Sequence, residues 1–153
     1  MRTGVRLAVD VGSVRVGVAR SDGSGSLAVP VVTLKRDAGD LRALADLVTE
    51  YEVLEVIVGW PITLDNRRGP AAEHALNYAK SLAEVVVVPI RLVDERLTTA
   101  AAQRGLHEVG RTVKNSRSVI DQAAAVQLLQ DALDTEARTG AAPGTSLEEV
   151  ASE

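Results

Sequence analysis

The chain has 153 residues, a formal net charge of −4, no cysteine and only three aromatic residues, Tyr51, Trp60 and Tyr78. This length is typical of one domain with a sizeable core, and the lack of cysteine excludes disulfides and thiolate metal sites. The acidic balance excludes a protein that coats nucleic acid through bulk positive charge, and so few aromatics exclude an interleaved platform for stacking single-stranded bases. No segment is typical of a signal peptide or a membrane span, so we expect a cytoplasmic protein without membrane partners.

The N-terminal part of the sequence predicts a sheet that begins as a meander. Two apolar segments, Val5–Val9 and Val14–Ala19, are separated by Gly12 and Ser13, which is typical of a hairpin of two core strands. Ala28–Leu34 predicts a third strand after a turn-rich connection.

Helical and strand patterns then alternate along the chain. Asp40, an expected N-cap, begins an amphipathic helix that runs to Tyr51, and Val53–Val58 predicts a buried strand. A second helix is expected over Pro70–Glu84 and a fifth strand over Val85–Val93. Because helices connect these strands, this half of the sheet should be parallel.

The last third of the sequence predicts two more helices and a tail. They are expected over Thr99–Val109 and Val119–Glu136, with a polar, basic loop between them. Residues 138–153 mix Gly, Pro, Ser and acids without an apolar period, so we expect a disordered tail after one domain spanning residues 1–137. The order of elements indicates an α/β protein with a mixed sheet and helices on its faces.

Four acidic residues are candidates for a metal site. Asp10 interrupts and ends an apolar strand, where an ionised carboxylate is costly unless a positive group compensates it. Asp94 and Glu95 end the fifth expected strand, and Asp121 lies in the first turn of the last expected helix. Ligand sites tend to form at the carboxyl ends of strands in α/β sheets, and clustered carboxylates favour Mg²⁺ or Mn²⁺. Two such ions would support phosphodiester hydrolysis.

Each acid also has a purely structural interpretation. Asp10 beside Gly12 could form a turn, and Asp94 could take part in a local ion pair with Arg96. The spacing of Ser118 and Asp121 fits a capping box at the start of a helix. Only the combination of these acids favours a metal site over the structural alternatives.

Basic loop residues are candidates for contacts with phosphates, and ordinary solvated charge is the alternative for each of them. The candidates are Arg67, Arg68, Arg111, Lys114 and Arg117. His74 and His107 have no ligand-like spacing, and we assign them no role.

Four stretches together, LAVDVGSVRVGVARSD, IVGWP, VDERLTT and SVIDQAAAVQLLQ, resemble the YqgF family, also called RuvX, of Holliday junction resolvases. The resemblance covers the chain from Arg6 to Asp134. It implies an RNase H-like fold, here a mixed five-stranded sheet with helices on both faces. It also implies one of two roles, the resolution of four-way DNA junctions or the 5′ trimming of precursor 16S rRNA.

The resemblance also implies roles for individual residues. Asp10, Glu95 and Asp121 match the catalytic, metal-binding acids of the family, and Asp94 is a further candidate ligand beside Glu95. Asn66 stands where the family often has glycine, and asparagine tolerates the left-handed conformation that such a turn needs.

Two rival functions remain open from the sequence. The acid-then-glycine hairpin also occurs in nucleotide-binding modules of the sugar kinase, Hsp70 and actin superfamily, which need two related domains to close over ATP. A catalytically idle scaffold is the other alternative. Both nuclease substrates present phosphates, so the sequence does not choose between a DNA junction and precursor rRNA. A junction resolvase would need two symmetric sites and therefore a homodimer.

Overall fold

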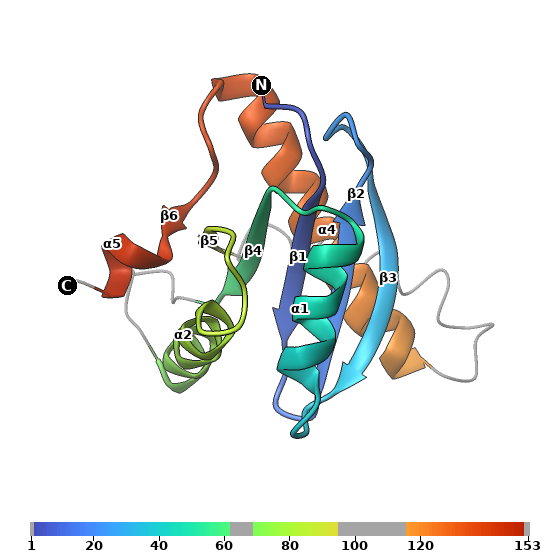
Figure 1. Cartoon of the computed structure of the whole chain (residues 1–153), viewed down its shortest axis with the longest axis vertical. Helices are drawn as coiled ribbons and strands as arrows, with labels where there is room; N and C mark the ends of the chain where they lie inside the picture. The colour runs from blue at the N-terminus through green and yellow to red at the C-terminus, as the bar shows by residue number, and fades with distance from the viewer. Residues whose placement is uncertain (1, 62–68, 95–115, 152–153) are drawn as a thin grey trace.

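The computed structural model describes residues 2–61, 69–94 and 116–151, except for the side chains of residues 116–121. One mixed sheet has the strand order β3-β2-β1-β4-β5-β6, and helices cover both of its faces (Figure 1). The expected α/β class is confirmed. The described part of the chain contributes six strands to this sheet, whereas the sequence predicted five.

The predicted N-terminal meander consists of three antiparallel strands, β1 (Arg6–Val11), β2 (Arg15–Ser21) and β3 (Ala28–Lys35). Gly12 begins the turn between β1 and β2, where its N–H donates to the Arg15 carbonyl at 2.8 Å. A Cβ on residue 12 would lie 2.7 Å from that carbonyl oxygen, closer than real Cβ contacts come. The tight turn therefore requires glycine.

The other half of the sheet is parallel, as predicted. Helix α1 (Asp40–Glu50) leads into β4 (Glu55–Trp60), and α2 (Pro70–Ala83) leads into β5 (Ile90–Asp94). β4 pairs in parallel with both β1 and β5. The carboxyl ends of these three strands therefore lie together at one end of the sheet, which we call the carboxyl end.

The fifth strand is shorter than predicted. The sequence indicated a strand over Val85–Val93, whereas β5 begins at Ile90. The N–H groups of Val85 and Val86 donate to the Leu82 carbonyl at 3.0 and 3.1 Å. These β-branched residues therefore close the end of α2 instead of pairing in the sheet, because the helix end supplies an acceptor for their N–H groups.

Asp40 is not the N-cap that the sequence predicted. Gly39 occupies the cap position, and Asp40 is buried at the start of α1. Its carboxylate accepts a hydrogen bond from the Tyr78 hydroxyl at 3.0 Å and lies 3.5 Å from Nε of Arg36. Tertiary contacts therefore decide the role of this carboxylate.

Apolar layers pack on both faces of the sheet. Helices α1 and α2 cover the face nearest the viewer in Figure 1 and bury Leu44, Leu76 and Leu82 in its core. Helix α4 (Ser116–Thr139) covers the opposite face, where several small side chains form one cluster. These side chains belong to Ala8, Ala19, Ala28, Ala125 and Ala132. No helix within the described ranges is both long and apolar enough to span a bilayer.

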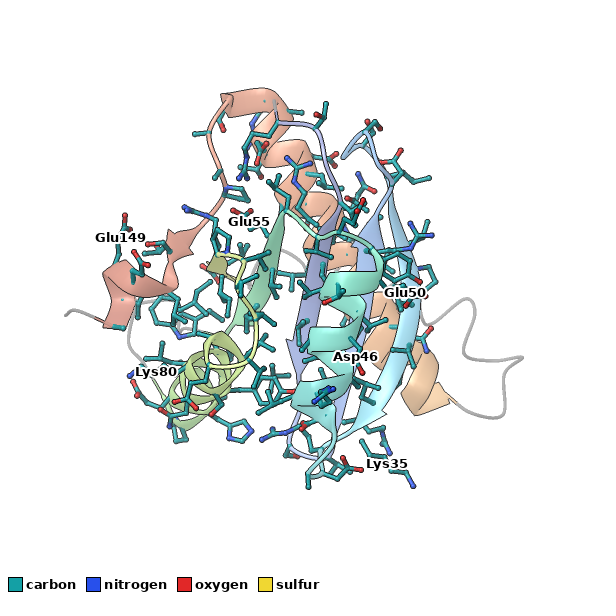
Figure 2. The ribbon with its side chains drawn as sticks, viewed as in Figure 1. Lys35, Asp46, Glu50, Glu55, Lys80 and Glu149 are labelled. Carbon is teal, nitrogen blue, oxygen red and sulfur yellow. The ribbon has the colours of Figure 1, made fainter. Side chains whose placement is uncertain are left out.

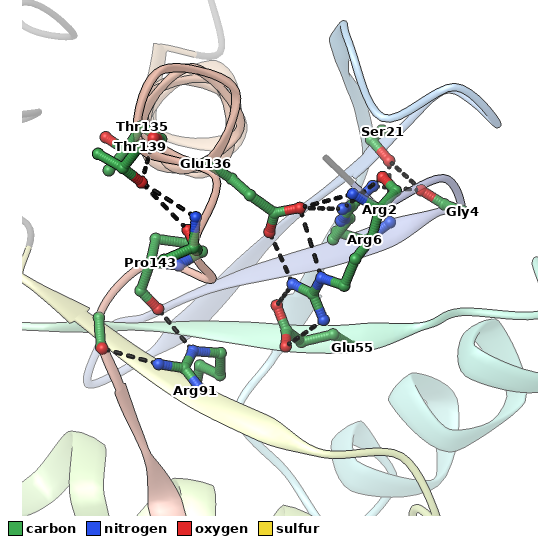
Figure 3. Close-up of polar contacts among 12 residues, drawn as sticks. Arg2, Gly4, Arg6, Ser21, Glu55, Arg91, Thr135, Glu136, Thr139 and Pro143 are labelled. Carbon is green, nitrogen blue, oxygen red and sulfur yellow. Dashed lines mark hydrogen bonds and ion pairs between the residues drawn. The ribbon is translucent and has the colours of Figure 1, made fainter.

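Buried charges join the end of α4 to the start of β1 (Figure 3). Nη2 of Arg6 donates to Oε2 of Glu136 at 2.8 Å, and these side chains are only 1% and 3% exposed. Arg2 donates to Glu136 at 2.7 Å and to Glu55 at 3.1 Å. We call these four residues the ionic cluster. It shows that α4 runs antiparallel to β1, because its last turns meet the first residues of that strand.

The carboxylates of the ionic cluster contrast with charged groups on α1 and α2. The side-chain hydrogen bond from Arg2 holds the pKa of the Glu136 carboxyl below its usual value, although burial opposes this shift. Figure 2 shows Glu55 at the start of β4, and it shows Asp46 and Lys80 on the helices of the near face. Asp46 and Lys80 are exposed to solvent, whereas Glu55 is buried.

The prediction of a disordered tail over residues 138–153 is wrong for the described part of that segment. β6 (Thr145–Ser146) pairs antiparallel with β5, and α5 (Leu147–Ala151) buries Leu147 and Val150. A two-residue strand and two buried side chains produce no apolar period, so the sequence pattern could not indicate them.

Arg91 on β5 holds the segment that leads into β6. Its guanidinium donates to the carbonyl oxygens of Pro143 at 2.6 Å and Gly144 at 2.8 Å (Figure 3). Gly144 has a φ of +71°, and a Cβ there would collide with the Leu92 carbonyl. Glycine therefore allows this segment to approach the edge of β5.

Candidate active site

Asp10 is half-buried and lies one residue before the end of β1. Ala8 belongs to the apolar cluster under α4, whereas Val9 belongs to the core under α1 and α2. Because side chains alternate along a strand, Asp10 points to the α4 face. The position opposite Asp10 on β2 is Gly17, which has no side chain, and the next position across the sheet is Thr33 on β3.

The first turns of α4 lie over this row of residues. Nε2 of Gln122 donates to Oγ1 of Thr33 at 3.1 Å. Two strand spacings separate Thr33 from Asp10, a distance of about 10 Å across the sheet. Asp121 precedes Gln122 on the helix, so its backbone lies at the carboxyl end, on the side of the sheet to which Asp10 points. Strand β1 and helix α4 therefore bring two of the predicted acids to one region.

Asp94 lies at the same end of the sheet but on the other face. It is the last residue of β5 and lies level with Trp60 of β4. The preceding residue, Val93, packs against the apolar cluster under α4. Alternation therefore turns Asp94 toward the face covered by α1 and α2. The structure does not bring Asp94 to the face of Asp10.

The other predicted site residues lie outside the description, and their roles stay predictions. Glu95 is outside the described residues, as is the helix expected over Thr99–Val109. The same holds for the side chains of Asp121 and Arg117 and for the remaining basic candidates, Arg67, Arg68, Arg111 and Lys114. Among the residues that are described, no three His, Asp or Glu side chains form a group that could hold a metal ion.

The start of α4 bears on the structural alternative for Asp121. A capping box requires Ser118 to be the N-cap, with Asp121 three residues later. Helix α4 begins at Ser116, three residues before Val119, the first helical residue that this interpretation requires. Ser118 therefore lies inside the first turn, which weakens the capping interpretation of Asp121.

One basic residue at the carboxyl end was missed by the sequence patterns. Arg36 follows β3, and its Nη1 donates to the Gly12 carbonyl at 2.9 Å, two residues beyond Asp10. The signal for it was weak, because a basic pair after a predicted strand is usually solvated. Only the packing of the hairpin against the start of α1 makes this side chain part of the same end.

Residues 4–135 match the RuvX family, which is described as Holliday junction resolvase. The chain belongs to the RuvX family. A Nocardioides sp. protein named "Putative pre-16S rRNA nuclease" is 52% identical to it, over 98% of this chain and 100% of the relative. A Thermobifida fusca protein with the same name is 54% identical, over 97% of this chain and 98% of the relative. Membership in the RuvX family supports the expected nuclease and does not favour the nucleotide-binding module.

Solved structures share the fold of this RuvX family member. Thermus thermophilus RuvC in complex with a Holliday junction aligns with a TM-score of 0.60 and 15% identity, over 94% of this chain and 99% of that chain. A second Thermus thermophilus RuvC structure has a TM-score of 0.55 and 16% identity, over 93% and 99% of the two chains. At this identity the likeness concerns the fold alone, and it confirms the expected RNase H-like architecture.

Proposed function

We propose that this RuvX family member is a divalent-metal-dependent nuclease that trims the 5′ end of precursor 16S rRNA. The observation that carries the proposal is the half-buried Asp10 carboxylate at the carboxyl end of β1, beneath the first turns of α4. The names of two relatives that are more than half identical over nearly the whole chain support rRNA as the substrate. Resolution of four-way DNA junctions is the second candidate, supported by the description of the family.

Asp10, Glu95 and Asp121 would hold the metal, because carboxylate oxygens are the ligands that Mg²⁺ and Mn²⁺ prefer. When bound, the metal would acidify a water molecule and stabilise the leaving oxygen of the cleaved phosphodiester. We exclude Asp94 from this set because its position in β5 turns it to the other face of the sheet. The protein itself contributes a rigid strand that fixes Asp10 and a helix start that carries Asp121.

Substrate contacts and assembly follow from the same proposal. Phosphates of the substrate would contact the basic loop residues, namely Arg67, Arg68, Arg111, Lys114 and Arg117. Cleavage of rRNA needs one site, whereas symmetric cleavage of a junction would need a homodimer. A cytoplasmic location suits a cysteine-free chain that acts on a ribosomal precursor.

A side-by-side cleavage assay tests the proposal. Wild type, Asp10→Asn and Asp46→Asn are compared on a precursor rRNA duplex and on a four-way DNA junction, with Mg²⁺ and then Mn²⁺. Removing a metal ligand should lower the cleavage rate at least about a hundredfold in Asp10→Asn while substrate binding persists. Asp46 is an exposed residue of α1, so Asp46→Asn should cleave like wild type.

Three outcomes decide between the alternatives. Faster cleavage of the rRNA by a monomer supports rRNA processing, and faster cleavage of the junction by a dimer supports the second candidate. Equal activity of Asp10→Asn and wild type would overturn the site assignment. Light scattering of the protein with each substrate measures the oligomeric state.

A further inference from the structure

A polar pocket of about 490 Å³ opens at the carboxyl end of the sheet, between α1, α2 and the β1–β2 turn. This volume falls within the range of ligand sites, which is roughly 300 to 1,000 Å³. None of the residues proposed to hold the metal lines it. Its lining includes Ser13, Arg36, Asp37, His74, Asn77 and Ser81.

Several contacts fix the planar guanidinium of Arg36 in this pocket. Nη1 donates to the Gly12 carbonyl at 2.9 Å and to Nε2 of His74 at 2.6 Å, and Nε lies 3.5 Å from the Asp40 carboxylate. All these contacts lie at the edge of a planar group. Its Cζ atom lies over the Tyr78 ring, 4.7 Å from the ring centroid.

This arrangement leaves part of Arg36 for a ligand. The side chain is 23% exposed, and its described contacts are with Gly12, His74, Asp40 and the Tyr78 ring. Nη2 makes no hydrogen bond within the part of the chain that the structure describes. A fixed guanidinium costs little conformational entropy when a flat ligand stacks on it.

The charge of the pocket selects the class of ligand. Asp37 and Asp40 line it together with Arg36, so a phosphate would meet two carboxylates for one guanidinium. A neutral, flat ligand avoids this repulsion. The amide of Asn77 and the hydroxyl of Ser81 offer both donors and acceptors, which suit the polar edge of a nucleobase.

We propose that this pocket binds an unpaired nucleobase of the substrate, stacked on the guanidinium of Arg36. Arginine guanidinium planes are among the groups on which proteins stack splayed-out bases. The proposal rests on the proposed nuclease function and adds a requirement for an unpaired nucleotide near the cut. The chain has only three aromatic residues on which bases could stack. Arg36, whose Cζ lies over the Tyr78 ring, would provide a planar group for stacking instead.

The pocket lies within reach of the candidate active site. Gly12, whose carbonyl Arg36 holds, is two residues beyond Asp10, or about 7 Å along an extended chain. Asp10 points to the α4 face, and the pocket lies on the face of α1 and α2. A single strand that crosses the β1–β2 turn would therefore contact both.

Binding of a fluorescent base tests the proposal without any cleavage. The probe is a short single-stranded RNA with 2-aminopurine, whose fluorescence falls on stacking, and the comparison is the same strand in a duplex. Both are titrated with the full chain in EDTA. Wild type should quench the single-stranded probe, and Arg36→Lys, which keeps the charge but loses the plane, should weaken this binding about tenfold.

Two further variants separate stacking from other effects. Asn77→Ala removes a polar group of the pocket and leaves the contacts of Arg36 in place. It should also weaken binding of the single-stranded probe. Arg42→Lys is the matched control, because Arg42 is 83% exposed on α1 and, among the described residues, its ion pair is with Asp46. It should bind like wild type. Duplex binding should stay within about twofold for all three variants.

The outcomes keep this proposal separate from the proposed function. Absence of quenching by wild type overturns the pocket even if the chain cleaves rRNA. If Arg36→Lys lowered the affinity for the single-stranded and duplex probes equally, Arg36 would act through its charge or through folding. That result would also overturn the proposed nucleobase pocket.

Discussion

The two ends of the sheet carry charged groups in opposite arrangements. At the end where β1 and β4 begin, the buried Glu55 and Glu136 are paired with arginines of the chain at 2.7 to 3.1 Å. At the carboxyl end, Asp10 points toward the first turns of α4, which carry Asp121. The acids proposed to gather there are of one sign. The paired charges at the first end therefore serve folding. For the acids at the carboxyl end we propose a different role, the binding of a metal ion.

This difference predicts opposite effects of removing a carboxylate from each end. Loss of one member of a buried pair leaves an uncompensated charge and destabilises the fold. Loss of one member of a group of like charges relieves repulsion and affects chemistry instead. Measurements of the free energy of unfolding with EDTA present can separate the two cases.

The largest effect should come from Glu136→Ala. This substitution leaves Arg6, which is 1% exposed, without its carboxylate, and it should lower the free energy of unfolding by about 3–5 kcal/mol. Urea denaturation followed by circular dichroism measures the change. Asp134→Ala, an exposed position on the same helix, is the control and should change it by less than about 0.5 kcal/mol. If Glu136→Ala also changed the free energy of unfolding by less than about 0.5 kcal/mol, the proposed difference between the two ends of the sheet would be contradicted.

Acid should weaken the interaction of Glu136 with Arg2 and Arg6, because the carboxylate becomes protonated. Hydrogen bonds from Arg2 lower the pKa of Glu136 in the folded state. The contribution of this carboxylate to the free energy of unfolding is therefore fully present above its ordinary pKa of 4.5. The contribution is lost as the pH falls through the lower folded-state pKa. The stability difference between wild type and Glu136→Gln should therefore narrow below about pH 4.5. A difference that stays constant down to pH 3 would contradict this account.

Removal of the C-terminal segment should have the next largest effect. A chain that ends at Arg138 loses β6 and α5 and exposes the surface that Leu147 and Val150 cover. Burial of two such side chains is worth about 2–4 kcal/mol after allowance for a compact unfolded state. Thermal melts of the truncated and full chains measure the loss. Equal melting temperatures would show that the segment covers the edge of β5 without stabilising it.

Asp10→Asn should act in the opposite direction. In EDTA its free energy of unfolding should equal that of wild type or exceed it by up to about 1 kcal/mol, because the proposed group of acids would lose one of its like charges. Urea melts of Asp10→Asn and of the surface control Asp46→Asn make the comparison. A loss comparable to that of Glu136→Ala would mean that Asp10 belongs to a structural pair.

The smallest stability effect should come from Asp121→Asn. As a metal ligand it should lose cleavage and Mn²⁺ affinity while its stability in EDTA changes by less than about 0.5 kcal/mol. Ser118→Ala should remain active. An active, metal-binding Asp121→Asn protein that has lost about 0.5 to 2 kcal/mol would restore the capping interpretation. Isothermal titration with Mn²⁺ supplies the affinity.

The sequence predicted those parts of the molecule that depend on local patterns. Apolar runs and helical spacing indicated β1 to β4, α1, α2 and most of α4, because burial of one face imposes a period on neighbouring residues. Asp10 stood out because a carboxylate in an apolar strand is costly and has few structural roles that would explain it. The predicted strand over Val85–Val93 and the cap at Asp40 failed where the end of a helix or a tertiary partner competed with the local preference.

What the sequence by itself determined is the α/β class, the parallel half of the sheet and the position of Asp10 at the end of a strand. Each follows from residues close to one another in the chain. Only the tertiary structure decided that Arg6 meets Glu136 across 130 residues, that Arg36 lies over the Tyr78 ring, and that Thr145–Ser146 form a sixth strand. It also turned Asp94 away from Asp10, because the face of a residue depends on the register of paired strands. Contacts between distant residues leave no period in the sequence, since each partner taken alone has an ordinary neighbourhood.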